Sequence, residues 1–504
     1  MNVIASKPRE ESADRRWARF SPIVTGEDYI ASLRDRGTTL YLFGEQVEEP
    51  VDHPMIRPSI NALARTYDLA IEDPELASAH SDLIDAPVNR FLHFVGGPQD
   101  LVMKNRMQRR LGQLTGTCFQ RCAGLDTISV LHSITYDIDA RHGTSYHKRF
   151  LAFMAQAQRN NVIVGAGMTD PKGDRSKRPS EQDDPDLFMH ITRRTEQGIY
   201  VRGAKAHMTG GWNSHWICVM PTMNLGPADK AFAVVGMVPA DADGITFIYG
   251  RQSCDTRAME AGDIDKGNAR FGGQEALVVF DDVFIPNDHV FMDGEYEFAQ
   301  EMVARFTNYH RASYVCKTGL GDVMVGAAAA IAEYNGADQA GHVKDKLVEM
   351  THLNETIYSS AIASSHEAKE LPSGIFMNDG MLANVCKHNV TRFPYEISRL
   401  AQDLAGGLMV TLPSEQDFEH AVAGPILRKY LQGRSNVPTE HRQRMLRLIE
   451  NMTLGRNAVG YLTESLHGAG SPQAQRIQIL RGMEVERKKG YARDLAGISP
   501  ETGD

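Results

Sequence analysis

The sequence predicts an α+β protein in which a helical N-terminal part, a middle β-domain and a C-terminal helical bundle follow one another. Apolar residues recur at helical spacing from about residue 26 to residue 143. Short β-rich runs separated by Pro, Gly, Asp and Asn fill residues 198–291. After Glu295 the helical period returns, so two helical parts enclose a β part.

The N-terminal part is expected to be helical over most of its length, with a short strand or turn at residues 40–44. The apolar positions that show the helical period are Tyr29, Leu33, Ile60, Leu63, Tyr67 and Leu69. At residues 168–175 the composition becomes turn-rich and charged, and Pro171 ends any helix there. We expect an N-terminal helical domain at 1–150, a middle β-domain at 151–294 and a C-terminal helical domain at 295–504.

The β part and the C-terminal part have distinct signatures. The expected strands are residues 198–201, 216–220, 231–238 and 276–280. A long helix is predicted from Val343, Leu347, Met350, Leu353 and Ile357. Strands and helices do not alternate regularly, and no Gly-x-Gly-x-x-Gly follows a strand, so we expect no Rossmann dinucleotide site.

Composition and charge exclude several classes of protein. The chain has 504 residues, a formal net charge of −10 and no long run of like charge, which predicts neither a nucleic acid nor a membrane surface as partner. The longest apolar run, residues 323–332, is far below the ~20 residues that span a membrane. Residues 1–20 lack a secretory signal, so we expect a cytoplasmic protein whose six cysteines stay reduced.

Two groups of residues are candidate metal ligands. Cys118 and Cys122 form a Cys-x-x-x-Cys pattern; on a helix their sulfurs would share one face and could hold one cluster. Two such cysteines are more often buried small apolar side chains. His310 and Cys316 would complete a Cys3His site, with Tyr314 and Lys317 as proton-transfer groups. The alternative is a helix start with a surface lysine and a packed tyrosine.

Other segments suit a flavin and acid–base chemistry. Amides at 168–175 and the Thr209 hydroxyl could bind a flavin edge while Lys172 or Arg175 balances phosphate charge, although by spacing alone these are loops. Gly406 and Gly407 permit close approach of a phosphate, or merely end a helix. Glu275 stands beside an apolar strand, where burial would raise its pKa; a solvated strand-edge Glu is the alternative.

Taken together, these segments resemble the 4-hydroxyphenylacetate 3-hydroxylase superfamily, and within it the 4-hydroxybutyryl-CoA dehydratase branch. The resemblance is carried by residues 25–29, 51–58, 168–176, 250–257 and 468–479 and covers nearly the whole chain. It implies an acyl-CoA-dehydrogenase-like scaffold, FAD, one [4Fe–4S] cluster, an acyl-CoA substrate and a homotetramer.

The resemblance also implies roles for individual residues. The implied cluster ligands are Cys118, Cys122, His310 and Cys316. The implied acid–base or positioning groups are Tyr314, Lys317, Glu275 and Glu464, with Arg109, Gln120 and Thr209 lining the substrate pocket. The implied FAD-binding residues are Met168, Thr169, Arg175, Thr209, Asn213, Gly406 and Gly407.

The implied reaction removes water from 4-hydroxybutyryl-CoA to give crotonyl-CoA and moves the double bond of vinylacetyl-CoA. The hydrogen on C3 is not activated by the thioester, so in this family a base removes the C2 proton and the flavin exchanges an electron and a hydrogen with the substrate. His310 is the implied base, and Tyr314 or Lys317 protonates the leaving group. Glu464 and Glu275 then serve in charge balance and reprotonation.

The spacing of the second ligand pair departs from the family pattern. Six residues, including a Gly-Gly step, separate the ligand His from its Cys in the family, whereas five separate His310 from Cys316. On a continuous helix the loss of one residue would rotate Cys316 by about 100° away from His310. A loop at Tyr314 and Val315 would absorb the change.

Two other functions stay open on sequence alone. The first is a two-component monooxygenase that hydroxylates a phenol with reduced FAD and oxygen. The second is a non-catalytic flavoprotein whose cluster site has decayed through the loss of one residue.

Overall fold

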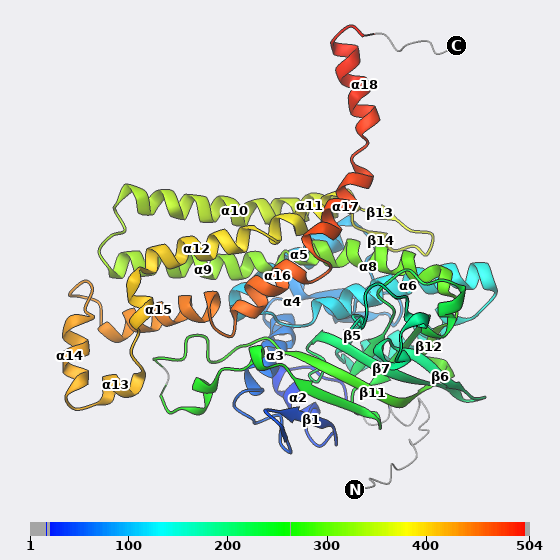
Figure 1. The fold of residues 1–504 in the computed structure, drawn as a ribbon, viewed down its shortest axis with the longest axis horizontal. Coiled ribbons are helices and arrows are strands. Elements are labelled where there is room, and N and C mark those ends of the chain that lie inside the picture. Colours follow the sequence, from blue (N-terminus) through cyan, green and yellow to red (C-terminus); the bar gives the residue numbers. More distant parts are fainter. Residues whose placement is uncertain (1–16, 18–20, 263, 499–504) are drawn as a thin grey trace.

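The computed structural model describes residues 17, 21–262 and 264–498. Apart from Trp17, the segment 1–20, which we expect to be a cytoplasmic start, lies outside the described residues. The order of elements is helical, then β, then helical, as the α+β prediction requires (Figure 1). The domain boundaries at 150 and 294 stay predictions.

The N-terminal part is built from helices with two small β elements. Its helices are α2 (Gly26–Ser32), α3 (Arg57–Glu72), α4 (Pro74–Ala77), α5 (Pro98–Thr115), α6 (Cys122–His142) and α7 (Tyr146–Asn160). β3 (Ser78–Ser81) pairs with β4 (Ala86–Asn89), and β1 (Thr39–Leu42) pairs with β2 (Glu45–Gln46). Tyr29, Ile60, Leu63 and Tyr67 are buried, which confirms the predicted apolar faces of α2 and α3.

The middle part contains two sheets. One has the strand order β2-β1-β10-β11-β7-β6 and the other the order β12-β9-β8-β5. The strands are β5 (Val164–Gly167), β6 (His190–Arg194), β7 (Gly198–Thr209), β8 (Trp216–Val219), β9 (Val234–Pro239), β10 (Ile245–Tyr249), β11 (Glu275–Pro286) and β12 (Val290–Asp293). All four predicted strands are present, but the one predicted at 231–238 begins at Val234, because residues 227–232 form a 3-10 helix. β1 joins the first sheet in parallel with β10, so the N-terminal segment completes the middle sheet.

The C-terminal part is mainly helical. Its longer helices are α8 (Ala299–Ser313), α9 (Cys316–Tyr334), α10 (Gly341–His366), α11 (Gly380–Val390), α12 (Phe393–Ala405) and α15 (Thr439–Thr453). Shorter helices are α13 (Glu415–Glu419), α14 (Ala423–Tyr430), α16 (Glu464–His467), α17 (Pro472–Gly482) and α18 (Val485–Leu495), and β13 (Lys369–Glu370) pairs with β14 (Phe376–Met377). Val343, Met350, Leu353 and Ile357 are buried along α10, as their spacing predicts.

Two main apolar cores hold these parts together. The first runs from the N-terminal helices through both sheets to α8, and the second joins α9, α10, α12 and α15. By length and composition, Tyr296–Tyr334 is the one helical stretch of the described chain that could cross a membrane, but 67% of its apolar window is buried inside the fold. It is a core element of the helical bundle.

Candidate active site

Cys118 and Cys122 are brought together by a turn rather than by one helix. α5 ends at Thr115, and Gly116 takes the left-handed backbone conformation with φ 59°. Cys118 lies in the loop that follows, Gln120 is left-handed with φ 64°, and Cys122 is the first residue of α6. The helical interpretation of the Cys-x-x-x-Cys spacing therefore does not hold.

Cys316 reaches the same place from the C-terminal part. α8 ends at Ser313 and α9 begins at Cys316, so Tyr314 and Val315 form a break between the two helices. A side-chain hydrogen bond from Cys122 lowers the pKa of the Cys316 thiol, whereas burial raises the pKa of Cys122. Cys118 interacts electrostatically with Cys316, so the sulfur of Cys316 comes close to the two sulfurs of the N-terminal part.

A buried carboxylate orients His310. Asp126 lies one turn after Cys122 on α6, and its Oδ2 is 2.7 Å from Nδ1 of His310. Its Oδ1 accepts hydrogen bonds from Lys104 at 2.9 Å and from Ser313 at 3.0 Å. Burial alone would raise the pKa of Asp126, but Lys104 and His310 hold it below its ordinary value. The bond to Nδ1 leaves Nε2 as the imidazole nitrogen available to a ligand.

Two carboxyl groups share a buried position beside the cysteines. The strand register places Glu275 directly opposite Thr209, whose hydroxyl donates to the Glu275 carboxyl group at 2.8 Å. A side-chain hydrogen bond joins Glu275 to Glu464, and Glu464 forms an ion pair of 2.7 Å with Lys317. Glu464 also hydrogen-bonds Cys118.

The surroundings of the two carboxyl groups set their pKa values apart. Burial and the charge of Glu464 raise the pKa of Glu275 well above its ordinary value. Burial is the largest influence on Glu464 and opposes its ionisation, but Lys317 and the hydrogen bonds from Glu275 and Cys118 together lower its pKa. Lys317 is 2% exposed, so the surface-lysine alternative is wrong. Glu275 is thus the member of the pair that holds a proton more strongly, and Glu464 is the member that ionises more readily.

The structure adds a residue that the sequence did not single out. Lys387 on α11 is fully buried, and its ammonium nitrogen lies 4.3 Å from the centroid of the Tyr314 ring. Lys317 lies 5.5 Å from the same centroid, and the His310 and Tyr314 rings are 5.3 Å apart. Tyr314 is therefore surrounded by charged groups of the site. A lone lysine within a helix offers no sequence signal of this kind.

Buried polar side chains form a hydrogen-bonded network next to the loop that carries Cys118. Asn213 donates to Gln120 at 2.8 Å and to Ser59 at 3.0 Å, and Gln120 donates to the Gly272 carbonyl at 3.2 Å. Gln274 is fully buried, yet both polar atoms of its side chain lack a described partner. Such an orphaned amide marks a position where a polar ligand or water is needed.

The segment after β5 is held by a buried ion pair. Lys205 on β7 lies 2.7 Å from Asp170 and also donates to the Met168 carbonyl at 3.0 Å. The Thr169 carbonyl accepts from the backbone of Ala206 at 2.7 Å. Arg175, farther along the same loop, is exposed. Met168 and Thr169 are thus fixed beside the strand that ends at Thr209.

Gly406, Gly407 and Arg109 are three predicted site residues that lie on or directly after helices. Gly406 ends α12 with φ 76°, and nothing stands within 4 Å of a Cβ placed on Gly406 or Gly407, so their backbone is open to close approach. α12 belongs to the second core, whereas Met168 packs against the first. Arg109 on α5 forms ion pairs with Asp322 at 2.8 Å and with Glu355.

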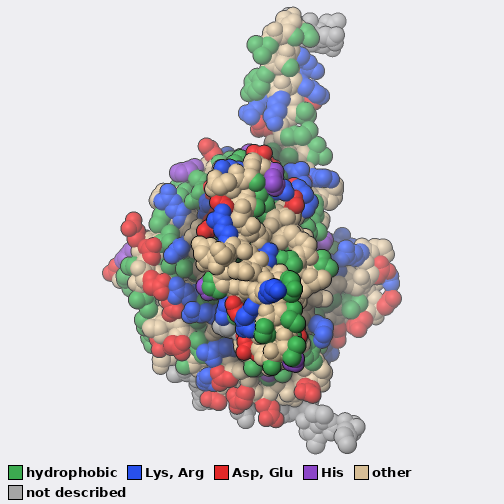
Figure 2. Space-filling view, turned by 90° about the vertical axis from the view of Figure 1, so that its left-hand side faces the viewer, with side chains coloured by type: hydrophobic (Ala, Val, Ile, Leu, Met, Phe, Trp, Pro, Cys, Tyr) green, Lys and Arg blue, Asp and Glu red, His purple; other side chains and the backbone are tan. Residues whose placement is uncertain are grey.

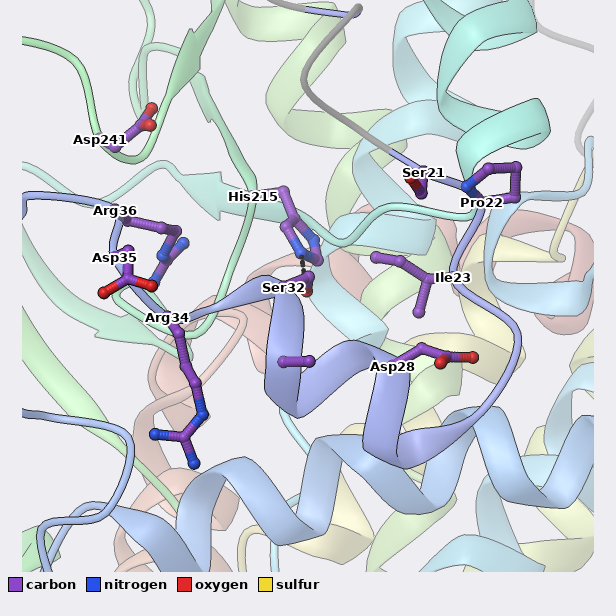
Figure 3. A pocket seen from close by; sticks show the side chains of 11 residues that line it. Ser21, Pro22, Ile23, Asp28, Ser32, Arg34, Asp35, Arg36, His215 and Asp241 are labelled. Atoms are coloured by element: carbon purple, nitrogen blue, oxygen red, sulfur yellow. Dashed lines mark hydrogen bonds between the residues drawn. The ribbon is translucent and has the colours of Figure 1, made fainter.

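A pocket of about 550 Å³ lies apart from this site, around α2 (Figure 3). Ser32 on α2 hydrogen-bonds His215 at 2.8 Å across it. None of the sequence-predicted site residues lines this pocket. Within the described ranges, no three His, Cys, Asp or Glu side chains are placed to hold a single metal ion.

Comparison with known proteins defines the class. The family model for the 4-hydroxyphenylacetate 3-hydroxylase N terminal matches residues 25–292, and the model for the 4-hydroxyphenylacetate 3-hydroxylase C terminal matches residues 299–497. The chain belongs to the 4-hydroxyphenylacetate 3-hydroxylase family.

Within this family the chain is similar to 4-hydroxybutyryl-CoA dehydratases. The chain is 55% identical to 4-hydroxybutyryl-CoA dehydratase/vinylacetyl-CoA-Δ-isomerase of Clostridium aminobutyricum, over 94% of this chain and 100% of that protein. A solved structure of an oxygen-tolerant archaeal 4-hydroxybutyryl-CoA dehydratase from N. maritimus is 66% identical, with a TM-score of 0.94 and 96% of each chain covered. The resemblance inferred from the sequence is confirmed.

More distant structures show the fold alone. The oxygenase component of 4-hydroxyphenylacetate 3-monooxygenase complexed with FAD is 24% identical, with a TM-score of 0.80 over 94% of this chain and 98% of that chain. An acyl-CoA dehydrogenase from Slackia heliotrinireducens aligns with a TM-score of 0.47, so that likeness is distant.

Proposed function

We propose that this chain dehydrates 4-hydroxybutyryl-CoA to crotonyl-CoA and isomerises vinylacetyl-CoA, using FAD and a [4Fe–4S] cluster. The observation that carries the proposal is the convergence of Cys118, Cys122 and Cys316 next to the Glu275 and Glu464 carboxyl groups. Phenol hydroxylation by a flavin requires no such set of thiols. The 55% identity to the clostridial dehydratase/isomerase supports the same reaction.

The donor set fits an iron–sulfur cluster. Thiolates are the usual cluster ligands, and His310 has its second nitrogen bonded to a carboxylate, as metal-binding imidazoles almost always do. A four-iron cluster spreads its ligands over four irons, so they need not meet at one point as they must around a single ion. Cys118, Cys122, Cys316 and His310 would hold the cluster, which would supply a Lewis acid for the departing hydroxyl group.

The residues near β7 fit a flavin. Gln274 is buried with an unpartnered amide, and Oδ1 of buried Asn213 is likewise unpartnered. Both adjoin the strand ends that carry Thr209 and Glu275, where a flavin ring would satisfy them. We assign FAD to Thr209 and Asn213 together with Met168, Thr169, Arg175, Gly406 and Gly407, and Arg109 and Gln120 to the substrate pocket. When bound, FAD would supply one-electron and hydrogen transfer.

The site residues divide the proton transfers. His310 would be a labile ligand of the cluster. Its Nε2, the nitrogen that is not bonded to Asp126, would when free of the iron take the C2 proton of the acyl-CoA. Tyr314 or Lys317 delivers a proton to the leaving hydroxyl group. Glu275, whose pKa is raised well above its ordinary value, returns a proton to the product carbon, while Glu464 balances the charge of Lys317.

We also propose that the enzyme is a cytoplasmic homotetramer. α18 stands clear of the body of the molecule (Figures 1 and 2). Its apolar side chains are exposed, Tyr491 by 57% and Leu495 by 92%. An isolated amphipathic helix is marginal in water, which favours packing against another copy. Removing residues 484–504 should lower the number of subunits per particle found by light scattering; an unchanged number would exclude α18 from the subunit contact.

Anaerobic isomerisation of vinylacetyl-CoA tests the function. Wild-type protein should convert it, whereas Cys118→Ala and His310→Ala should lose iron and turnover together. Cys254→Ala is the matched control, because Cys254 is also half-buried but its thiol donates to the Gly250 carbonyl and is not among the proposed cluster ligands. Unchanged turnover in both site variants would defeat the cluster mechanism.

Analysis of iron and sulfide separates the dehydratase from the alternatives. A cluster-free protein that consumes oxygen with reduced FAD and a phenol would be a monooxygenase. The chain is 26% identical to the 4-hydroxyphenylacetate 3-monooxygenase oxygenase component of Thermus thermophilus, which makes this the alternative to test. A protein that binds FAD but converts neither substrate would be the non-catalytic flavoprotein.

A further inference from the structure

Lys387 is a buried ammonium group whose partners are uncharged. It donates to the Ser465 carbonyl on α16 and lies over the Tyr314 ring, and none of the ion pairs among the described residues includes it. Burying a charge without a counter-ion costs stability unless other contacts compensate. A lysine kept in such a place is therefore a candidate for a role in the site.

The groups around Lys387 come from four helices. Arg311 of α8 and Lys317 of α9 repel its charge, while Glu464 of α16 and its own neighbour Cys386 on α11 attract it. Burial, followed by the two cations, lowers the pKa of Lys387 to about 7. The ammonium form is thus maintained only weakly, although it faces the electron-rich side of the Tyr314 ring.

Tyr314 has little freedom on its other side. A Cβ placed on Gly468 would lie 1.5 Å from the phenol oxygen, so this oxygen is packed against the end of α16. Glu464 begins the same helix, directly after a π-helical turn at Val459–Thr463. Lys387 therefore contacts both the phenol ring and the helix that carries the carboxylate.

We propose that Lys387 is a positioning residue of the active site, which fixes the Tyr314 ring against α16 so that its phenol keeps a set place beside Glu464 and Lys317. This inference rests on the proposed function, because it assumes that the Tyr314 hydroxyl takes part in proton transfer. A displacement of about 1 Å at a reacting group lowers turnover by about 100-fold.

Kinetics of holoenzyme variants with vinylacetyl-CoA test the proposal. Lys387→Met should lower kcat by about 10- to 100-fold with KM, iron and FAD content unchanged. Lys387→Arg, which keeps a cation over the ring, should recover most of kcat. In Tyr314→Phe, adding Lys387→Met should cause little further loss, because the hydroxyl that it positions is gone. Losses that multiply, or wild-type kcat in Lys387→Met, would overturn the proposal.

A stability cycle keeps this outcome separate from that of the proposed function. If wild-type protein does not isomerise vinylacetyl-CoA, the proposed function fails. The melting temperatures of Lys387→Met, Tyr314→Leu and the double variant then show whether the contact between Lys387 and Tyr314 contributes to stability. Non-additive shifts support positioning of Tyr314 by Lys387. Additive shifts would mean that the two side chains act independently, which overturns it.

Discussion

Removing one partner of the buried Lys205 and Asp170 pair should destabilise the middle domain strongly. The side chains are 1% and 5% exposed and 2.7 Å apart. In Lys205→Met the Asp170 carboxylate still accepts hydrogen bonds from the backbone N–H of Met189 at 3.0 Å and from the Thr222 hydroxyl at 3.2 Å, but it loses its counter-ion. Breaking a buried pair in this way costs about 3–5 kcal/mol. The Met168 carbonyl also loses its donor, so the proposed flavin loop is released.

Chemical denaturation and flavin content measure this effect. The free energy of unfolding of Lys205→Met should fall by about 3–5 kcal/mol, with less FAD bound per chain. Arg34→Met is the control, because its ion pair with Asp52 is 41% and 56% exposed and its loss should leave both quantities unchanged. If Lys205→Met destabilises the protein no more than Arg34→Met, the pair does not stabilise the loop and the reasoning is wrong.

Three further predictions concern the site. The pKa of Lys387 is about 7 in the folded chain and 10.5 ordinarily, so the unfolded chain binds more protons between these two values. The stability of the wild-type protein should therefore rise as the pH increases above about 7. Lys387→Met should lack this rise when melting temperatures at about pH 6 and about pH 9 are compared. Asp126→Asn replaces the carboxylate that orients His310 with a neutral amide, which has one acceptor oxygen where His310, Lys104 and Ser313 now share two. It should lower iron affinity about 10- to 100-fold in a chelator competition; wild-type iron retention would contradict this role. Gly468→Ala puts a methyl group on the phenol oxygen of Tyr314 and should abolish most isomerase activity while leaving iron bound; full activity would show that the phenol is free to move.

Local patterns in the sequence are enough to predict most elements and the types of ligand. Apolar spacing predicted the helices, and β-rich runs bounded by turn residues predicted strands 198–201, 216–220, 231–238 and 276–280, because both signals depend on neighbours in the chain. The sequence left a continuous helix and a loop both open after His310, and the structure has a break at Tyr314 and Val315. The family resemblance supplied the assignment of roles.

The tertiary structure decided which polar groups are buried together. Asp126 and Lys387 look like ordinary helix-surface charges in the sequence, yet each is buried against partners from distant segments. Asp126 bonds His310, which is 184 residues away in the chain, and Lys387 bonds Ser465, which is 78 residues away. Whether Glu275 holds its proton likewise depends on Glu464, which only the fold brings near. Burial and electrostatic coupling depend on distance in space, and the order of residues in the chain does not encode that distance locally.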